Sequence, residues 1–512
     1  MKARMGERKR SDLVSLLQRE GHLYEFLIGC GIIILWIRPL RSSFWLDELG
    51  TYWVVRAGLA DAIDLALKYQ GQSPAYYLIA WLARNVGRGS EAVLRSPSLL
   101  AGLFAAILVG RLGRRLFGPN AGWASALVFA ATPIVTFSAV NARPYAFAYL
   151  ALAAATVSLI NLLEDRGARW GPAYGAAVAA TIHFHYLFGF ALLGHVPFLL
   201  SRWPGRERPA RRGLWTALAI LAILLFPLIF QIPYLLAHAR IPDLPLGRPS
   251  MEALLISLVP LPILAGLVLG LLIARSIGPI ELQGRGEQGA LTLVAGLWLA
   301  GPSGLLLSSV ASDINLMWPT YARSSALGAA LLVGAGVATI RSPTARRIVL
   351  LLVAICGQVA ANGRWYADQD WRGAVAEVNA LIDDPGTPVL MHAAFVEGTH
   401  VALLRDPGYR SLLLAPLSRY PVQGKIVPIP FDLTDASESY LERRVVPSVE
   451  GSHRLVLVTL ENGSGLTAWF QGRLQPLGFE SRRVGDHGAV QVTLFERGRP
   501  HGARGSSAGM SP

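Results

Sequence analysis

Long apolar runs alternate with short charged connections between residues 23 and 362. A membrane-spanning helix needs roughly 20 apolar residues, and fewer where it crosses only part of the bilayer. By this measure the chain has eleven candidate spans, namely 23–40, 96–117, 121–139, 144–163, 172–182, 187–200, 214–237, 253–274, 290–311, 321–340 and 348–362. The pattern predicts a polytopic α-helical membrane protein.

Arginines are concentrated in alternate connections, such as "GRLGRRLFG", "SRWPGRERPARRG" and "RSPTARR", whereas "SAVNAR" and "SDINLMWPT" are nearly bare. Cytoplasmic loops carry the excess of basic residues, so this distribution predicts a cytoplasmic N-terminus. Merging 172–200 into one span would move "SRWPGRERPARRG" outside, which favours an odd count with "HFHY" (183–186) at an outward turn. The basic N-terminus precedes an apolar run without an A-x-A cleavage pattern, which indicates an uncleaved first span.

An odd number of spans places the C-terminal region on the extracytoplasmic face. From residue 363 acids and prolines increase and apolar runs shrink to strand length. Residues 387–395 and 453–461 are expected to be buried strands, 488–498 an alternating edge strand, and 371–383 and 466–478 helices. We therefore expect a transmembrane domain over 1–362, an extracytoplasmic α/β domain over 363–499 and a disordered tail over 500–512.

Composition excludes several classes of function. The chain has 512 residues, of which 53% are hydrophobic and only 16% charged, with a mean hydropathy of +0.42, which is too apolar for an ordinary soluble globule. The net charge of +14 is scattered over short blocks and no nucleic-acid-binding module is present, so a nucleic-acid partner is not expected. Cys30 and Cys356 lie in apolar runs and show no metal-ligand or disulfide spacing.

A pair of acids, Asp47 and Glu48, lies in "RSSFWLDELGTYW" (41–53), just past the first span. This stretch opens a predicted outer loop, 41–95, in which 59–70 and 74–86 are expected to be amphipathic helices along the membrane interface. Acids at a helix start often only cap it. The flanking aromatic residues would also shield the carboxylates and strengthen them as bases. Adjacent helical residues point about 100° apart, so we take Asp47 as the reactive acid and Glu48 as orienter, metal ligand or cap.

Several motifs together resemble the C-type (GT-C) membrane glycosyltransferases, in particular the group of protein O-mannosyltransferases and bacterial aminoarabinose lipid A transferases. The resemblance covers roughly residues 20–380 and follows the order of its motifs, which are "FWLDELGTYW", "QSPAYYLIAWLAR", "LRSPSLLAGL", "TPIVTFSAVNARPYAFAYLAL" and "DWRGAVAEV".

This resemblance implies an inverting transfer of a sugar from a polyprenyl-phosphate carrier, undecaprenyl or dolichyl by analogy, to an acceptor at the extracytoplasmic face. It implies a catalytic base at Asp47, followed by Glu48, in a bacterial inner (plasma) membrane protein. Many members carry a histidine two residues before the loop proline, where this chain has Gln72 before Ser73 and Pro74. A donor or metal role for that position is therefore not carried over.

Two arginines begin predicted spans on the same face as the acid pair, Arg143 in "NARPYAF" and Arg323 in "TYARSSA". An arginine at a span end is commonly a snorkelling anchor. A guanidinium fork also suits phosphate oxygens, which makes both residues candidates for binding the donor phosphate. The further candidates for lining the site are Tyr52, Pro74, Tyr76, Tyr145, His183 and His185, and the two histidines have a buried structural role as their alternative.

The sequence leaves other matters open. It specifies no cofactor, with a divalent metal ion as an open alternative, and it does not distinguish a glycan, a lipid or a protein as acceptor. A polytopic transporter or lipid-linked saccharide flippase also needs many spans and a central cavity. The charges gather at one face and the spans hold few ionisable residues, which favours an enzyme acting at the membrane surface. An oligosaccharide ligase and an inactive scaffold remain further alternatives.

Overall fold

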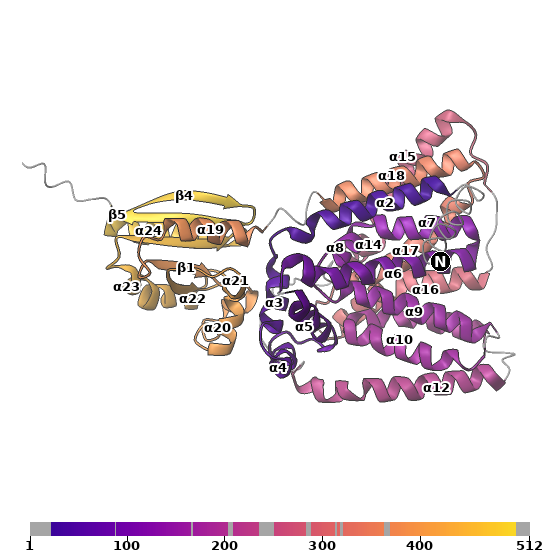
Figure 1. The fold of residues 1–512 in the computed structure, drawn as a ribbon, viewed down its shortest axis with the longest axis horizontal. Helices are drawn as coiled ribbons and strands as arrows, with labels where there is room; N and C mark the ends of the chain where they lie inside the picture. The colour runs from indigo at the N-terminus through magenta and orange to yellow at the C-terminus, as the bar shows by residue number, and fades with distance from the viewer. Residues whose placement is uncertain are drawn as a thin grey trace, which may run out of the picture. The chain divides into compact units, whose positions relative to one another are not determined.

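The computed structural model describes residues 22–87, 89–164, 167–202, 208–234, 250–282, 288–312, 315–317, 321–362 and 369–497. The chain divides into two compact units (Figure 1). The first unit contains residues up to Ser42 and from Val54 to Tyr366, and the second contains Ser43–Trp53 together with the region from Ala367 onward. The expected disordered tail, 500–512, lies outside the described residues.

The first unit is mainly helical in its described part. Its helices are α2 (Leu23–Ile37), α4 (Leu59–Tyr69), α5 (Ala75–Gly87), α6 (Glu91–Phe117), α7 (Pro119–Ala131), α8 (Pro133–Ala139), α9 (Tyr145–Leu163), α10 (Trp170–Phe184), α11 (His195–Arg202), α12 (Arg208–Leu225), α14 (Met251–Leu258), α15 (Leu261–Ile277), α16 (Gln288–Ser312), α17 (Ser325–Ala338) and α18 (Pro343–Asn362). Short 3-10 segments cover Arg38–Arg41, Tyr186–Gly194, Phe226–Gln231 and Ala322–Ser324. Helix α3 (Leu46–Val55) begins in the second unit.

Each predicted apolar segment is at least partly helical, but fewer helices are long enough to span a bilayer than the sequence predicts. Among the described residues six helices pass by length and composition, and up to eight if two bent pairs each count as one span. These pairs are α7 with α8, bent by 73°, and α14 with α15, bent by 53°. Prolines explain both breaks, because Pro133 begins α8 and Pro260 precedes α15. The count of eleven and the orientation remain predictions.

Helix α9 lies at the centre of the helical unit. In its apolar window 78% of the residues are buried, whereas only 11% are buried in the span Ala210–Tyr234. Small residues allow close contacts around this centre. A Cβ on Gly194 would lie 2.4 Å from the backbone carbon of Gly296, and one on Gly171 would lie 2.1 Å from the carbonyl oxygen of Gly213. Close backbone approach through small residues is typical of packed membrane helices.

The second unit is built on a five-stranded mixed sheet in the order β2-β1-β3-β5-β4 (Figure 1). Its strands are β1 (Pro388–His392), β2 (Lys425–Ile429), β3 (Arg454–Leu460), β4 (Phe479–His487) and β5 (Val490–Arg497). Its helices are α19 (Trp371–Leu381), α20 (Pro407–Leu413), α21 (Ala415–Arg419), α22 (Asp435–Tyr440), α23 (Val446–Val449) and α24 (Ser464–Leu474). Strand β1 pairs in parallel with β2 and β3, whereas β5 is antiparallel to β3 and β4. The predicted α/β character of this region is confirmed.

The prediction that 488–498 is an edge strand is wrong. Strand β5 lies between β3 and β4, because a two-residue loop with Gly488 at φ +68° folds the chain back as a hairpin. The edge strand β4, "FESRRVGDH", is mostly exposed and highly charged, which hides its strand character in the sequence. Charged side chains on an edge oppose pairing with other chains.

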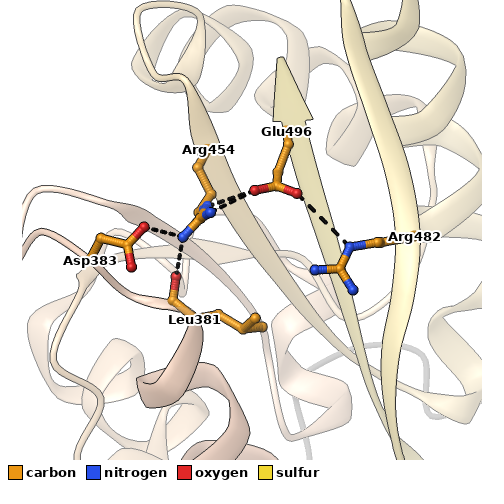
Figure 2. A network of polar contacts seen from close by, with 5 residues as sticks. All are labelled: Leu381, Asp383, Arg454, Arg482 and Glu496. Atoms are coloured by element: carbon orange, nitrogen blue, oxygen red, sulfur yellow. Dashed lines mark hydrogen bonds and ion pairs between the residues drawn. The ribbon is translucent and has the colours of Figure 1, made fainter. Parts of the chain in front are cut away.

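Arg454 links several elements of this sheet (Figure 2). On β3, its Nε and Nη2 donate to Glu496 Oε1 of β5 at 2.9 and 2.7 Å, and its Nη1 donates to the carbonyl of Leu381 at 3.1 Å. It also contacts Asp383, and Glu496 in turn lies 3.9 Å from Nε of Arg482 on β4. The network joins three strands and the end of α19.

Candidate functional site

The segment that carries the acid pair is held by the C-terminal part of the second unit. The backbone N–H of Phe44 donates to the Tyr420 hydroxyl at 3.1 Å, and that of Leu46 donates to Gln369 Oε1 at 2.9 Å. At the other end, the indole N–H of Trp53 donates to Ser411 Oγ at 2.9 Å. Helix α3 is therefore fixed at both ends by residues more than 300 positions away.

The two acids of this segment have different surroundings. Glu48 is 1% exposed, and its Oε2 accepts the backbone N–H of Trp45 at 3.3 Å, as the third residue of a helix does in a capping box. Asp47 is half-buried in the first turn. Tyr52, one turn later, is also half-buried and lies 5.6 Å below the guanidinium carbon of Arg419. The geometry supports the capping alternative for Glu48.

Arg323 is the centre of a buried aromatic cluster in the first unit. The residue is 2% exposed, and its guanidinium carbon lies 4.1 Å from the centroid of the Tyr145 ring and 4.7 Å from that of Phe137. The Tyr149 hydroxyl donates to the Arg323 carbonyl at 2.6 Å, which fixes the turn before α17. Burying a guanidinium costs free energy unless other groups stabilise its charge. Here the rings of Phe137 on α8 and Tyr145 on α9 pack against it.

Arg143 approaches the same cluster from the turn between α8 and α9. It is 6% exposed, its N–H donates to the Asn141 carbonyl at 2.7 Å, and its own carbonyl accepts the Ser98 hydroxyl at 3.2 Å. The Asn141 amide is buried, and neither its oxygen nor its nitrogen has a hydrogen-bond partner among the described residues. A buried amide without hydrogen-bond partners destabilises the folded state. A polar ligand that bonds to Asn141 would remove this cost.

His185 completes the cluster. Its ring lies 5.2 Å from the Tyr145 ring and 6.2 Å from that of Tyr321, and its Nδ1 is buried without a partner among the described residues. The structure thus brings together, within one unit, Arg323, Tyr145 and His185 from the sequence-based candidates.

A cavity of about 420 Å³ borders this cluster, and Arg323 is the only charged residue among its described lining. Most of the remaining lining comes from the turn between α7 and α8, the turn between α14 and α15, and helix α17, with Ala360 from α18, and it is mostly apolar. The three guanidinium nitrogens of Arg323 are themselves buried, so the cavity lies next to the cation rather than directly against it. An apolar cavity beside a buried guanidinium suits a hydrocarbon chain with an anionic headgroup.

His183 has a structural contact of a different kind. Its Nε2 lies 2.8 Å from the Leu224 carbonyl, which can only accept, so this nitrogen carries the proton. Its Nδ1 then accepts the hydroxyl proton of Ser73 at 3.0 Å. The ring thereby ties α10 to α12 and to the loop that precedes α5.

The remaining sequence candidates lie beside this tie. Pro74 follows Ser73 directly, and Tyr76 is buried with its ring 5.9 Å from that of Phe147 on α9. In the second unit, Asp370 caps α19 by accepting the Gly373 N–H at 3.0 Å. The described residues contain no group of three or more His, Cys, Asp or Glu side chains arranged to hold a metal ion.

Sequence reasoning missed three participants, Ser73, Asn141 and Tyr149. Tyr149 follows Tyr145 by four residues on a predicted helix, a spacing that places both rings on one face. Asn141 begins the motif "NARPYAF", which contains Arg143. Nothing in the sequence indicates that its amide is buried without hydrogen-bond partners. Ser73 follows Gln72 in the loop, and nothing in that stretch of sequence predicts its contact with His183.

Comparison with known proteins agrees with this architecture. The family model described as dolichyl-phosphate-mannose-protein mannosyltransferase matches residues 71–230. The crystal structure of ArnT from Cupriavidus metallidurans in the apo state aligns over 92% of this chain and 97% of its own, with a TM-score of 0.55 and 14% identity. The chain has the GT-C membrane glycosyltransferase fold.

A second structure of the same ArnT, bound to undecaprenyl phosphate, aligns over 92% of this chain and 97% of its own, with 13% identity and a TM-score of 0.53. No curated protein sequence matches this chain significantly. The GT-C similarity extends over both units, and the family match covers α5 to α12, which include Arg143, Tyr145, His183 and His185.

Proposed function

We propose that this protein is an inverting glycosyltransferase that moves a sugar from a polyprenyl-phosphate donor to an acceptor at the extracytoplasmic face of a membrane. The observation that carries the proposal is the buried Arg323, whose guanidinium packs on the Tyr145 and Phe137 rings and whose residue borders an apolar cavity, in a GT-C fold. The ArnT structure with undecaprenyl phosphate supports a lipid phosphate as the leaving group.

The donor phosphate is assigned to Arg323 and Arg143. A sugar leaves a lipid phosphate most easily when cations stabilise the charge that develops on the phosphate oxygens. Arg323 is pre-oriented by the two rings, so it loses little freedom on binding. Asn141 and His185 supply buried polar atoms next to the two arginines in the same unit, suited to sugar or phosphate oxygens.

The proton is assigned to Asp47. The acceptor hydroxyl oxygen attacks the anomeric carbon, its proton passes to the Asp47 carboxylate, and the bond between that carbon and the phosphate oxygen breaks. The carrier leaves as a lipid phosphate, and attack from the opposite side inverts the anomeric centre. Glu48 supports this role indirectly by holding the first turn of α3 through Trp45.

The test is sugar transfer by the purified full-length protein with a panel of polyprenyl-phosphate sugars. Asp47→Asn keeps the shape of the side chain but removes the base, so turnover is expected to fall by about 10²–10⁴-fold. Asp64→Asn is the matched control, because Asp64 is an exposed acid of α4 that pairs only locally with Lys68. Equal turnover by Asp47→Asn and wild type would remove Asp47 as the base, and a donor panel without any turnover would argue against the enzyme itself.

A further inference from the structure

A groove distinct from the arginine cluster lies between α2, α6 and α7, all labelled in Figure 1. Its volume is about 560 Å³, within the range of small-molecule sites. Arg111 and Arg114 are the only charged residues among its described lining, which is otherwise almost entirely apolar.

Small residues give the groove its depth. Helices α6 and α7 approach closely, since a Cβ on Gly110 would lie 3.2 Å from the Cβ of Ala126. Helix α2 contributes Gly29 to the lining, where a Cβ would meet only Leu127 Cδ2, at 3.6 Å. The space beside Gly29 is therefore open to a ligand rather than filled by a side chain.

The length of the groove matches one leaflet of a bilayer. It extends along α2 from Phe26 to Trp36 and along α6 from Leu103 to Arg114. Ten or eleven residues of helix rise about 15–17 Å, which is about half of the ~30 Å hydrocarbon core. A ligand that fills it would reach from the headgroup region to the middle of the membrane.

The charge lies at one end only. Arg111 and Arg114 are exposed near the end of α6, and among the described residues neither has a carboxylate within 4 Å. The next arginine, Arg115, differs because it pairs with Glu164 at 2.5 Å. On α2, Glu25 is buried, and its Oε1 forms an ion pair with Nε of Arg347 on α18 at 3.7 Å. Glu25 is not among the residues that line the groove.

We propose that this groove binds one anionic glycerophospholipid from the leaflet at its arginine end, which the sequence predicts to be cytoplasmic. One acyl chain lies along Gly29 and Trp36, and the headgroup phosphate lies between Arg111 and Arg114. The two cations select a net negative headgroup over a zwitterionic one. This site is separate from the proposed donor site and does not depend on sugar transfer.

Native mass spectrometry of the full-length protein tests the site, with phosphatidylglycerol, phosphatidylcholine and undecaprenyl phosphate added in turn. Wild type is expected to retain one phosphatidylglycerol in preference to phosphatidylcholine. Undecaprenyl phosphate, which the proposed donor site also binds, should be retained equally by wild type and by the groove variants. Arg111→Gln with Arg114→Gln should weaken its retention roughly tenfold to thirtyfold. The matched control removes the same charge at two exposed arginines of α12, Arg211→Gln with Arg212→Gln, and should retain the lipid.

Filling the groove gives an independent measurement. Gly29→Leu should displace the acyl chain and lower retention to a similar extent. Gly31→Leu places the same side chain on the exposed face of α2, where a Cβ meets nothing within 4 Å, and should leave retention unchanged. Equal loss in both leucine variants, equal loss in both arginine pairs, or a preference for phosphatidylcholine would overturn the proposal. Groove variants that lose undecaprenyl phosphate instead of phosphatidylglycerol would also overturn it.

Discussion

The guanidinium carbon of Arg323 lies 4.1 Å from the centroid of the Tyr145 ring, and Phe137 lies 4.7 Å from it as a second ring. Aromatic rings around a guanidinium fix the plane in which its N–H groups point. An ammonium group in the same place would be a point charge without that planar fork. Replacing Arg323 by lysine would therefore keep the positive charge and remove only the oriented N–H groups.

The first prediction is that Arg323→Lys lowers kcat/KM for the polyprenyl-phosphate donor on the order of 10²-fold, because the charge is kept and the oriented donors are lost. Steady-state transfer with varied donor concentration measures it. Arg341→Lys is the control, since Arg341 is an exposed arginine that pairs with Glu281 at 2.7 Å. If the two lysine variants have the same activity, Arg323 is a structural cation and not a phosphate ligand.

Hydrophobic periodicity in the sequence predicts the helices and the buried strands of the fold. Apolar runs predict the helices of the first unit, and buried strands such as β3 have long apolar stretches. The order of the sheet does not follow, because β4 is charged and exposed and β2 contains Pro428 within five residues. The bends in two apolar segments do not follow either, because hydropathy treats each segment as continuous although a proline breaks the helix.

The candidate site is predictable in its residue types but not in its contacts. Arg143 and Arg323 stand out because cations are rare in their loops. The hydrogen bond between His183 and Ser73 joins residues 110 positions apart, and no local sequence pattern predicts it. The attachment of α3 to Tyr420 and Ser411 is equally nonlocal, which is why the acid pair could be assigned to a loop but not to a partner.

The second prediction separates Glu48 from Asp47. Glu48→Gln keeps an acceptor for the Trp45 N–H and should retain stability, whereas Glu48→Ala should lose roughly 0.5–2 kcal/mol as a lost cap does. Thermal unfolding in detergent gives the stabilities and sugar transfer gives the activities. A drop in transfer for Glu48→Gln as large as that for Asp47→Asn would contradict a capping role.

The third prediction concerns the tie between Ser73 and His183. Ser73→Ala leaves the half-buried Nδ1 without its donor and should cost about 1 kcal/mol of stability. A double-mutant cycle with His183→Gln should give a coupling energy of about 0.5–3 kcal/mol, because both changes break the same contact. Reversible unfolding in mixed micelles measures each corner of the cycle.

The control for this cycle is Ser276→Ala, since the Ser276 hydroxyl is exposed and bonds only within its own helix. It should show no coupling to His183→Gln. Loss of donor turnover by His183→Gln without loss of stability would instead assign His183 to the donor site, as the sequence alternative allows.

The fourth prediction is a pH dependence of the second unit through His392. Its Nε2 donates to the Phe431 carbonyl at 2.6 Å and its Nδ1 accepts the Leu460 N–H at 3.2 Å, so the neutral ring is fully satisfied. Burial lowers the pKa of His392 from 6.5 to about 4. Because the unfolded chain binds the proton more tightly, stability should be constant above pH 6.5 and fall by up to about 3 kcal/mol as the pH drops toward 4.

Hydrogen exchange of peptides from β1 and β3, corrected for the intrinsic rate at each pH, follows the stability of this unit in the full-length protein. His392→Gln has no proton to gain, so it should be less stable at neutral pH but lose the part of the pH dependence that His392 supplies. His453→Gln changes an exposed histidine next to β3 and should keep the wild-type dependence. If His392→Gln and wild type lose protection in parallel between pH 6.5 and 4, groups other than His392 control the acid sensitivity of the sheet.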